Sequence, residues 1–223
     1  MEINLTEIQK LKMSIVANLN FDVEKAKQVF NFVIGNEPVQ VAPMQQFWSD
    51  GVYYVLKGGH LATTDDPDTI AEQVIGVAVK MGDKIATVAL HDAADGEEIA
   101  LTTDTPCGSE KFFHSDFFEA ITDWDGEGNT KDYGNFLNPK IALDEGQYIP
   151  SLAQLYLILL NINEVNQALE AVGGTPMKKN WYWSSTEGSA YNSWYVNFGS
   201  GNSGYGSNKF NTNVVRPAVA LSV

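Results

Sequence analysis

The segment 181–213 constrains the fold of this chain more than any other part of it. About two-thirds of its residues are Asn, Ser, Tyr or Gly, yet tryptophans recur through it. Trp183, Trp194, Val196 and Phe198 alternate with polar residues, which is the pattern of strands that bury one face. A flexible low-complexity loop would have the same composition, but it would not need tryptophans at this spacing. We therefore expect short strands here, with Trp183 and Trp194 in the core.

The polar residues of this segment indicate a binding surface. Antibody combining sites have a similar composition, because Tyr supplies a large contact area at little entropic cost while Ser, Asn and Gly provide adaptable hydrogen bonding. Tyr195 and Asn197 lie between the apolar positions, so their side chains are expected to face solvent. The pattern predicts a scaffold that displays polar and aromatic side chains to a ligand.

Charge and cysteine content exclude several classes of function. The formal net charge is -14, with only 14 Lys and Arg residues, so the chain is expected to repel nucleic acids and anionic membranes. Cys107 is the only cysteine, so neither an intrachain disulfide nor a multi-cysteine zinc site can form. Neither a signal-peptide pattern nor an apolar run long enough to span a bilayer is visible, so we expect no membrane insertion.

Residues 1–43 are predicted to form a helical N-terminal segment. Thr6 and Gln9 have the spacing of a capping box, and Asp22 could begin a second helix that Gly35 ends. This segment could mediate attachment or homo-oligomerisation, or it could simply pack against the main domain, residues 44–223.

The main domain is predicted to be α+β with a mixed, mainly antiparallel sheet and two or three helices. Ser151 and Gln154 form a second capping-box pattern, and Asn161 could begin the next helix, which Gly173 and Gly174 would end. A shorter helix is expected near Phe117. Strands are predicted at 51–56, 74–80, 84–90 and 99–103, with a hairpin turn at 81–83.

Four stretches of the sequence resemble one known protein family. The motifs WSSTE at 183–187 and VRP at 215–217 resemble those of variable proteins of diversity-generating retroelements. The runs ITDWDGEGNT at 121–130 and YIPSLAQLYLILLNINEVNQALEAVGG at 148–174 resemble the middle of the same proteins. The resemblance implies a C-type-lectin-like fold related to the formylglycine-generating enzyme. It covers roughly residues 51–223 and does not extend to residues 1–43.

In this family, mutagenesis at adenines of a template copy changes some codons and spares the scaffold codons between them. Carried over to this chain, the resemblance implies the following variable, ligand-binding positions: Tyr182, Gly188, Ser189, Tyr191, Asn192, Tyr195, Asn197, Ser200, Asn202, Ser203, Tyr205, Ser207, Asn208, Phe210, Asn211 and Thr212. The implied scaffold positions are Trp183, Ser184, Ser185, Trp194, Val196, Phe198, Gly201, Arg216 and Pro217.

The expected function is that of a receptor-binding protein, such as a phage or bacterial surface adhesin, on a virion tail or a cell surface. Its partner would be a macromolecule, either a cell-surface protein or a glycan. We expect no enzymatic activity and no cofactor, because the formylglycine-generating relatives rely on a pair of cysteines and this chain has only Cys107. The alternatives are a structural virion or fimbrial subunit, or an oxidase of the formylglycine-generating type.

Three weaker patterns in the sequence could indicate other kinds of site. The glycines of 199–204 match a dinucleotide fingerprint, but no helix is predicted after them. His91 and Asp92 could form a catalytic pair, although no nucleophile motif accompanies them. Oxygen-bearing side chains alternate as in a calcium loop or a capped turn at Asp123, Asp125, Glu127 and Asn129. We expect a capped turn and no metal.

Overall fold

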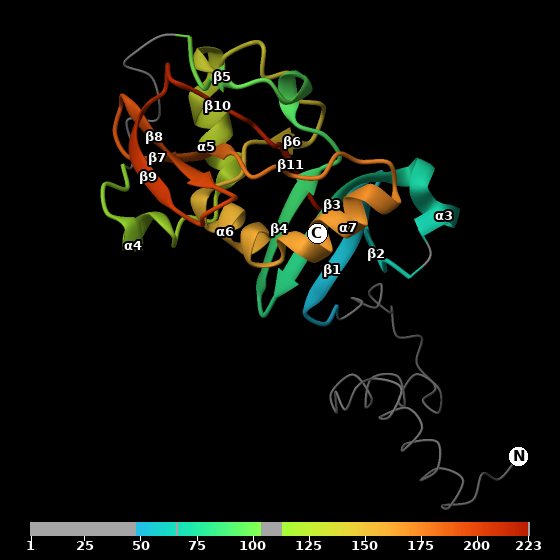
Figure 1. Cartoon of the computed structure of the whole chain (residues 1–223). Helices are drawn as coiled ribbons and strands as arrows, with labels where there is room; N and C mark the ends of the chain where they lie inside the picture. The colour runs from blue at the N-terminus through green and yellow to red at the C-terminus, as the bar shows by residue number, and fades with distance from the viewer. Residues whose placement is uncertain (1–47, 66, 104–112, 223) are drawn as a thin grey trace, which may run out of the picture. The chain divides into compact units, whose positions relative to one another are not determined.

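The computed structural model describes residues 48–65, 67–103 and 113–222 (Figure 1). Over these ranges the chain is α+β and its sheets are mainly antiparallel, as predicted. The predicted helical segment 1–43 and Cys107 lie outside the described residues.

Four antiparallel strands form the first sheet, in the order β2-β1-β3-β4. The predicted hairpin is present, and its turn contains Gly82 with a φ of 60°, a conformation that favours glycine. The strand bounds are β1 (Gly51–Leu56), β2 (Leu61–Ala62), β3 (Val74–Met81) and β4 (Lys84–Ala89).

This sheet buries side chains on both faces. Tyr54, Val77 and Val88 face the main hydrophobic cluster, where helices α6 (Leu152–Leu160) and α7 (Ile162–Ala171) cover the sheet (Figure 1). The residues between them, such as Val55 and Ala78, face a smaller cluster that contains Val219. Burial on both faces explains why β3 is a nearly continuous apolar run rather than a strict alternation.

The two long helices begin and end at the residues that the sequence indicated. Ser151 accepts a hydrogen bond from the Gln154 backbone N–H at 3.4 Å, and the Gln154 side chain accepts one from the Ser151 N–H at 2.8 Å, so the predicted capping box is present. Asn161 precedes α7 but its side chain makes no capping bond. Gly173 follows α7 with a φ of 77°, which fits a C-terminal glycine stop.

A second sheet of three antiparallel strands carries the segment singled out above. Its order is β7-β8-β9. Two short ladders, β5–β10 and β6–β11, connect it to the rest of the domain. The strand bounds are β5 (Ile99–Ala100), β6 (Gln147–Tyr148), β7 (Trp181–Glu187), β8 (Asn192–Asn197), β9 (Ser203–Asn208), β10 (Thr212–Asn213) and β11 (Ala218–Val219).

The described residues contain more helical segments than the two or three predicted. Helices α3 (Pro67–Ile70) and α4 (Phe117–Ala120) are single turns, and α5 (Gly126–Tyr133) was not predicted. Short 3-10 turns add to these at Ala71–Gln73, Ala93–Gly96 and Gly134–Phe136. The sequence of α5 has low helix propensity, since it contains two glycines and an asparagine, and tertiary contacts decide its conformation.

Trp183 and Trp194 are core residues, as predicted. Trp183 is fully buried and Trp194 is 3% exposed. Val196 and Phe198, which share the alternating pattern with them, are also buried. The indole N–H of Trp183 donates to the Ile99 carbonyl at 3.0 Å, so burial leaves this polar group satisfied.

Candidate functional site

The second sheet and its connecting loops display most of the predicted contact residues. Tyr191, Tyr205 and Phe210 are large side chains that expose 53%, 42% and 41% of their surface. The other exposed members of the predicted set are Ser200, Asn202, Asn211 and Thr212. The half-buried members are Ser189, Asn192, Tyr195, Asn197, Ser203 and Asn208. We call the exposed and half-buried members together the display surface.

Tyr182 does not belong to the display surface, and its assignment as a contact residue was wrong. It is fully buried, its ring packs 4.9 Å from that of Phe198, and its hydroxyl accepts a hydrogen bond from the Lys178 backbone N–H at 2.9 Å. Strand β7 separates two hydrophobic clusters, so Trp183 fills one and Tyr182 fills the other. A strand between two clusters has no solvent face, so the resemblance implied the wrong role for Tyr182.

Gly188 and Ser207 are also buried and are removed from the predicted contact set. A Cβ atom at position 188 would lie 2.7 Å from the Cβ of Tyr205, so any larger residue would push on the neighbouring strand. Ser207 accepts a hydrogen bond from the Asn211 side chain at 3.2 Å. Both residues are therefore buried positions that contact members of the display surface.

Several half-buried members shape the loops with their side chains. The Asn197 side-chain oxygen accepts hydrogen bonds from the backbone N–H groups of Gly199 and Ser200 at 2.8 and 3.0 Å. Ser189 accepts one from the Asn192 N–H at 3.1 Å. Such local bonds hold a turn in place, so a substitution at Asn197 or Ser189 would alter the loop as well as the contact chemistry.

Tyr195 is half-buried over two indole rings. Its ring lies 4.9 Å from that of Trp181 and 5.9 Å from that of Trp183. It therefore presents only one edge or face to solvent, and it couples the display surface to the core.

The buried motif 183–187 holds the sheet against the helices. The Ser184 hydroxyl donates to the Trp194 carbonyl at 2.9 Å across the sheet. The Thr186 hydroxyl donates to the Asp123 carboxylate at 2.6 Å and accepts from the Leu152 N–H, the first residue of α6, at 2.9 Å. These hydroxyls satisfy backbone groups where the pairing of β7 with β8 is irregular. The implied scaffold role of Ser184 and Ser185 agrees with their complete burial.

Lys209 fixes the loops at one end of the display surface. Its side chain is fully buried, forms an ion pair with Glu187 and donates to the Ala190 carbonyl at 3.0 Å. Its backbone N–H donates to the Tyr191 carbonyl at 3.0 Å, and its carbonyl accepts from the Leu101 N–H at 2.8 Å. One residue thereby joins the loop before β8, the end of β9 and the β5 region. Residue spacing alone did not reveal this role.

Arg216 provides a second buried ion pair behind the sheet. Its guanidinium donates to the Asp92 carboxylate at 2.6 Å and to the carbonyls of Ala89 and Thr175 at 3.0 and 2.8 Å. Asp92 therefore serves the scaffold. His91 contacts the Thr175 hydroxyl at 2.9 Å, so the suggested His91–Asp92 pairing is replaced by two separate contacts.

An aromatic cluster extends the display surface beyond the residues that the sequence indicated. The Tyr205 ring lies 5.1 Å from Trp194, which lies 6.1 Å from Phe117 on α4. Phe117 also contacts the neighbouring Phe118, which is 74% exposed. The sequence did not indicate which of these two adjacent phenylalanines would be exposed.

The oxygen-bearing side chains at 123–129 cap a helix. Asp125 accepts a hydrogen bond from the Gly128 N–H at 2.9 Å and thereby caps α5. Asp123 accepts from the Asn129 side chain at 2.7 Å, and Glu127 pairs with Lys131 on the exposed face of the helix at 2.7 Å. The described residues hold no group of three or more His, Cys, Asp or Glu side chains placed to bind a metal ion.

Replacing Asp125 by alanine is expected to lower the free energy of unfolding by about 1 kcal/mol, the usual cost of a lost helix cap. Urea unfolding of the parent and the variant measures the difference. Added calcium should leave the parent's melting temperature unchanged. A calcium-dependent rise that Asp125→Ala abolishes would restore the calcium-loop interpretation.

The glycines of 199–204 lie in a strand–loop–strand connection, because β8 precedes them and β9 contains the last. The dinucleotide fingerprint requires a helix after its glycines, so that interpretation is wrong. Among these glycines only Gly201 has a positive φ, 74°.

The buried Tyr182 predicts a response to high pH. Burial, with a smaller contribution from the nearby Asp92 charge, raises the pKa of Tyr182 from 10.0 to about 12. The unfolded chain ionises this tyrosine first, so the contribution to stability is complete below about pH 10 and is lost as the pH rises toward 12. As the pH rises through this range, the free energy of unfolding should therefore fall less in Tyr182→Phe than in the parent. Urea unfolding at increasing pH measures both, and equal losses would contradict this account.

Four exposed members of the display surface should contribute little to stability. A fourfold variant with serine at Tyr191, Asn202, Phe210 and Thr212 is expected to change the free energy of unfolding by about 0.5 kcal/mol or less per site. Ser193→Ala is the buried control: its hydroxyl donates to the carbonyls of Ser184 and Thr186, so it should cost about 1 kcal/mol or more. Thermal melts compare them, and loss of cooperative unfolding in the fourfold variant would show that these residues build the fold.

Comparison with known proteins gives evidence about the fold but not about the function. The chain matches no known family profile and no curated protein. A crystal structure of a fimbrial protein from Bacteroides ovatus ATCC 8483 aligns with it at a TM-score of 0.55 and 17% sequence identity. The alignment covers 78% of this chain and 49% of that one, so this chain matches about half the length of the fimbrial protein. Over the described ranges, each helix is too short or too polar to cross a bilayer.

Proposed function

We propose that this chain is a ligand-binding protein of the C-type-lectin-like class, diversified by a retroelement, that acts as a surface adhesin of a phage or a bacterium. The observation that carries the proposal is the contrast within β7–β9 and their loops. Tyr191, Asn202, Tyr205 and Phe210 are exposed, while the motif 183–187 beneath them is buried and hydrogen-bonded. Side chains can thus change on the outside of this segment while the backbone keeps its bonds.

Recognition would rest on contact chemistry. Exposed Tyr and Phe side chains can anchor a partner, and Asn and Ser side chains can adapt their hydrogen bonds around those anchors. The buried pair of Lys209 with Glu187 lowers the entropic cost of binding, because it holds the neighbouring loops before the partner arrives. We propose a macromolecular partner, a cell-surface protein or a glycan, and no catalytic step or cofactor.

The DNA beside the gene tests diversification. Diversification requires a reverse transcriptase and a near-copy of the codons for residues 181–223. Differences between this copy and the gene should be confined to adenine positions of the copy and should fall in codons of the display surface. Absence of a near-copy would refute the proposal of a retroelement target, because the mutagenesis has no other template.

The fimbrial structural neighbour favours a second candidate, a structural subunit of a surface fibre. Such a subunit would assemble into polymers, and the display surface would then form contacts between copies. Size-exclusion chromatography with light scattering separates the two candidates. Concentration-dependent polymers that the fourfold serine variant cannot form would favour the structural subunit, whereas a parent and variant of equal mass would favour the adhesin.

A further inference from the structure

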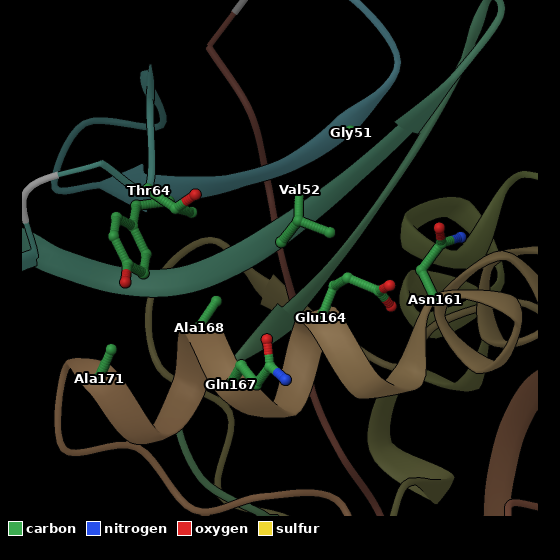
Figure 2. A pocket seen from close by; sticks show the side chains of 9 residues that line it. Gly51, Val52, Thr64, Asn161, Glu164, Gln167, Ala168 and Ala171 are labelled. Carbon is green, nitrogen blue, oxygen red and sulfur yellow. The ribbon is translucent and has the colours of Figure 1, made fainter.

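A cavity of about 450 Å³ lies between α7 and β1, away from the residues of the display surface (Figure 2). This volume is within the range of small-ligand sites. Its lining comprises Gly51, Val52, Tyr54, Thr64, Asn161, Glu164, Gln167, Ala168 and Ala171.

Helix α7 presents a single stripe of side chains to this cavity. Asn161, just before the helix, and Glu164, Ala168 and Ala171 follow one another at intervals of three or four residues, which places them on one face. In Figure 2 the Glu164 side chain extends from the helix into the space between Val52 and Asn161. The small alanines leave the volume open, and with Val52 they provide an apolar wall.

Tyr54 forms part of the inner wall of the cavity. The residue is only 1% exposed and packs in the main hydrophobic cluster, yet it lines the cavity. It therefore adds to the wall that Val52 and the alanines form.

The charge of the lining selects the kind of ligand. Glu164 has no ion-pair partner among the described residues, and the cavity lining includes no Lys, Arg or His. Thr64, Asn161 and Gln167 add uncharged oxygen acceptors to the lining. The Glu164 carboxylate would repel an anion, whereas an ammonium group can bind it with a charge-assisted hydrogen bond.

We infer that this cavity binds an alkylammonium group, with the nitrogen at Glu164 and the alkyl chain along Val52, Ala168 and Ala171. The group could belong to a free aliphatic amine or to a lysine side chain of another protein. This inference does not depend on the function proposed for the display surface, since none of the lining residues belongs to that surface.

Titration of the full chain with n-pentylamine, followed by backbone amide NMR shifts, tests the inference. Shifts should appear at Val52, Thr64 and Ala168, with a dissociation constant on the order of millimolar, as suits so small a ligand. Pentan-1-ol has the same chain without the charge and should bind at least about fivefold more weakly. A blocked lysine peptide, compared with its norleucine counterpart, distinguishes the two sources: binding of pentylamine alone indicates a free amine, and binding of both admits a lysine side chain.

Matched variants distinguish pentylamine binding in the cavity from non-specific attraction of a cation to an acidic protein. Glu164→Gln should weaken pentylamine binding about fivefold, with a melting temperature close to the parent's. Glu170→Gln is the control, because Glu170 is exposed on the same helix but does not line the cavity. Equal weakening by Glu164→Gln and Glu170→Gln, or the absence of pentylamine shifts at the cavity, would overturn the inference.

Discussion

Replacing Arg216 by methionine is expected to lower the free energy of unfolding by about 3–5 kcal/mol, because it leaves the Asp92 carboxylate buried without its counter-ion. The loss also removes the donors to the Ala89 and Thr175 carbonyls, which join the end of β4 to the loop after α7. Chemical denaturation monitored by tryptophan fluorescence measures the change.

Two further variants identify the cause of this loss. Arg216→Lys keeps the charge, but its donors share one nitrogen and cannot reach all three acceptors that the guanidinium nitrogens contact, so it should recover only part of the stability. The double variant Arg216→Met with Asp92→Asn removes both charges and should be less damaging than the sum of the two single variants. A loss below about 1 kcal/mol in Arg216→Met would show that the buried pair contributes little.

Lys209→Met is expected to destabilise the chain by a similar amount, about 3–5 kcal/mol, because the Glu187 carboxylate then stays buried without its ion pair. Its effect should also be local: the Lys209 side chain bonds to Ala190, and its backbone bonds to Tyr191. Hydrogen exchange should therefore show faster opening of residues 188–192 than in Arg216→Met, in addition to the global loss.

Removing both charges distinguishes a charge penalty from lost packing. The double variant Lys209→Met with Glu187→Met replaces the pair by apolar groups of similar length and should restore much of the stability. If the double variant is as unstable as Lys209→Met, the single-variant loss comes from packing against Tyr133, whose ring centroid lies 5.2 Å from the Lys209 ammonium.

Local patterns predicted much of this architecture. The β-branched runs around Gly82 form the β3–β4 hairpin, and the capping box of Ser151 and Gln154 begins α6. Trp183 and Trp194 lie in the core, as their alternation with polar residues indicated. These features depend on residues close in sequence, so a single chain is enough to recognise them.

Contacts between distant residues could not be predicted in the same way. Asp92 and Arg216 are 124 positions apart, and nothing in the surroundings of either residue indicates the other. The family resemblance implied that Tyr182 is a contact residue, but β7 lies between two clusters and buries both Tyr182 and Trp183. Helix α5 forms from a glycine-containing run because Asp125 caps it and Thr130 bonds to the Ile149 backbone. Each of these outcomes depends on the tertiary environment.

Sequencing the codons for residues 181–223 from a natural population of the gene tests the central claim most directly. If the segment is a diversified recognition surface, amino-acid differences should concentrate at exposed positions such as Tyr191, Asn202, Tyr205 and Phe210. The buried Lys209 should remain unchanged throughout. Differences spread evenly over exposed and buried positions, or an invariant segment, would contradict the claim.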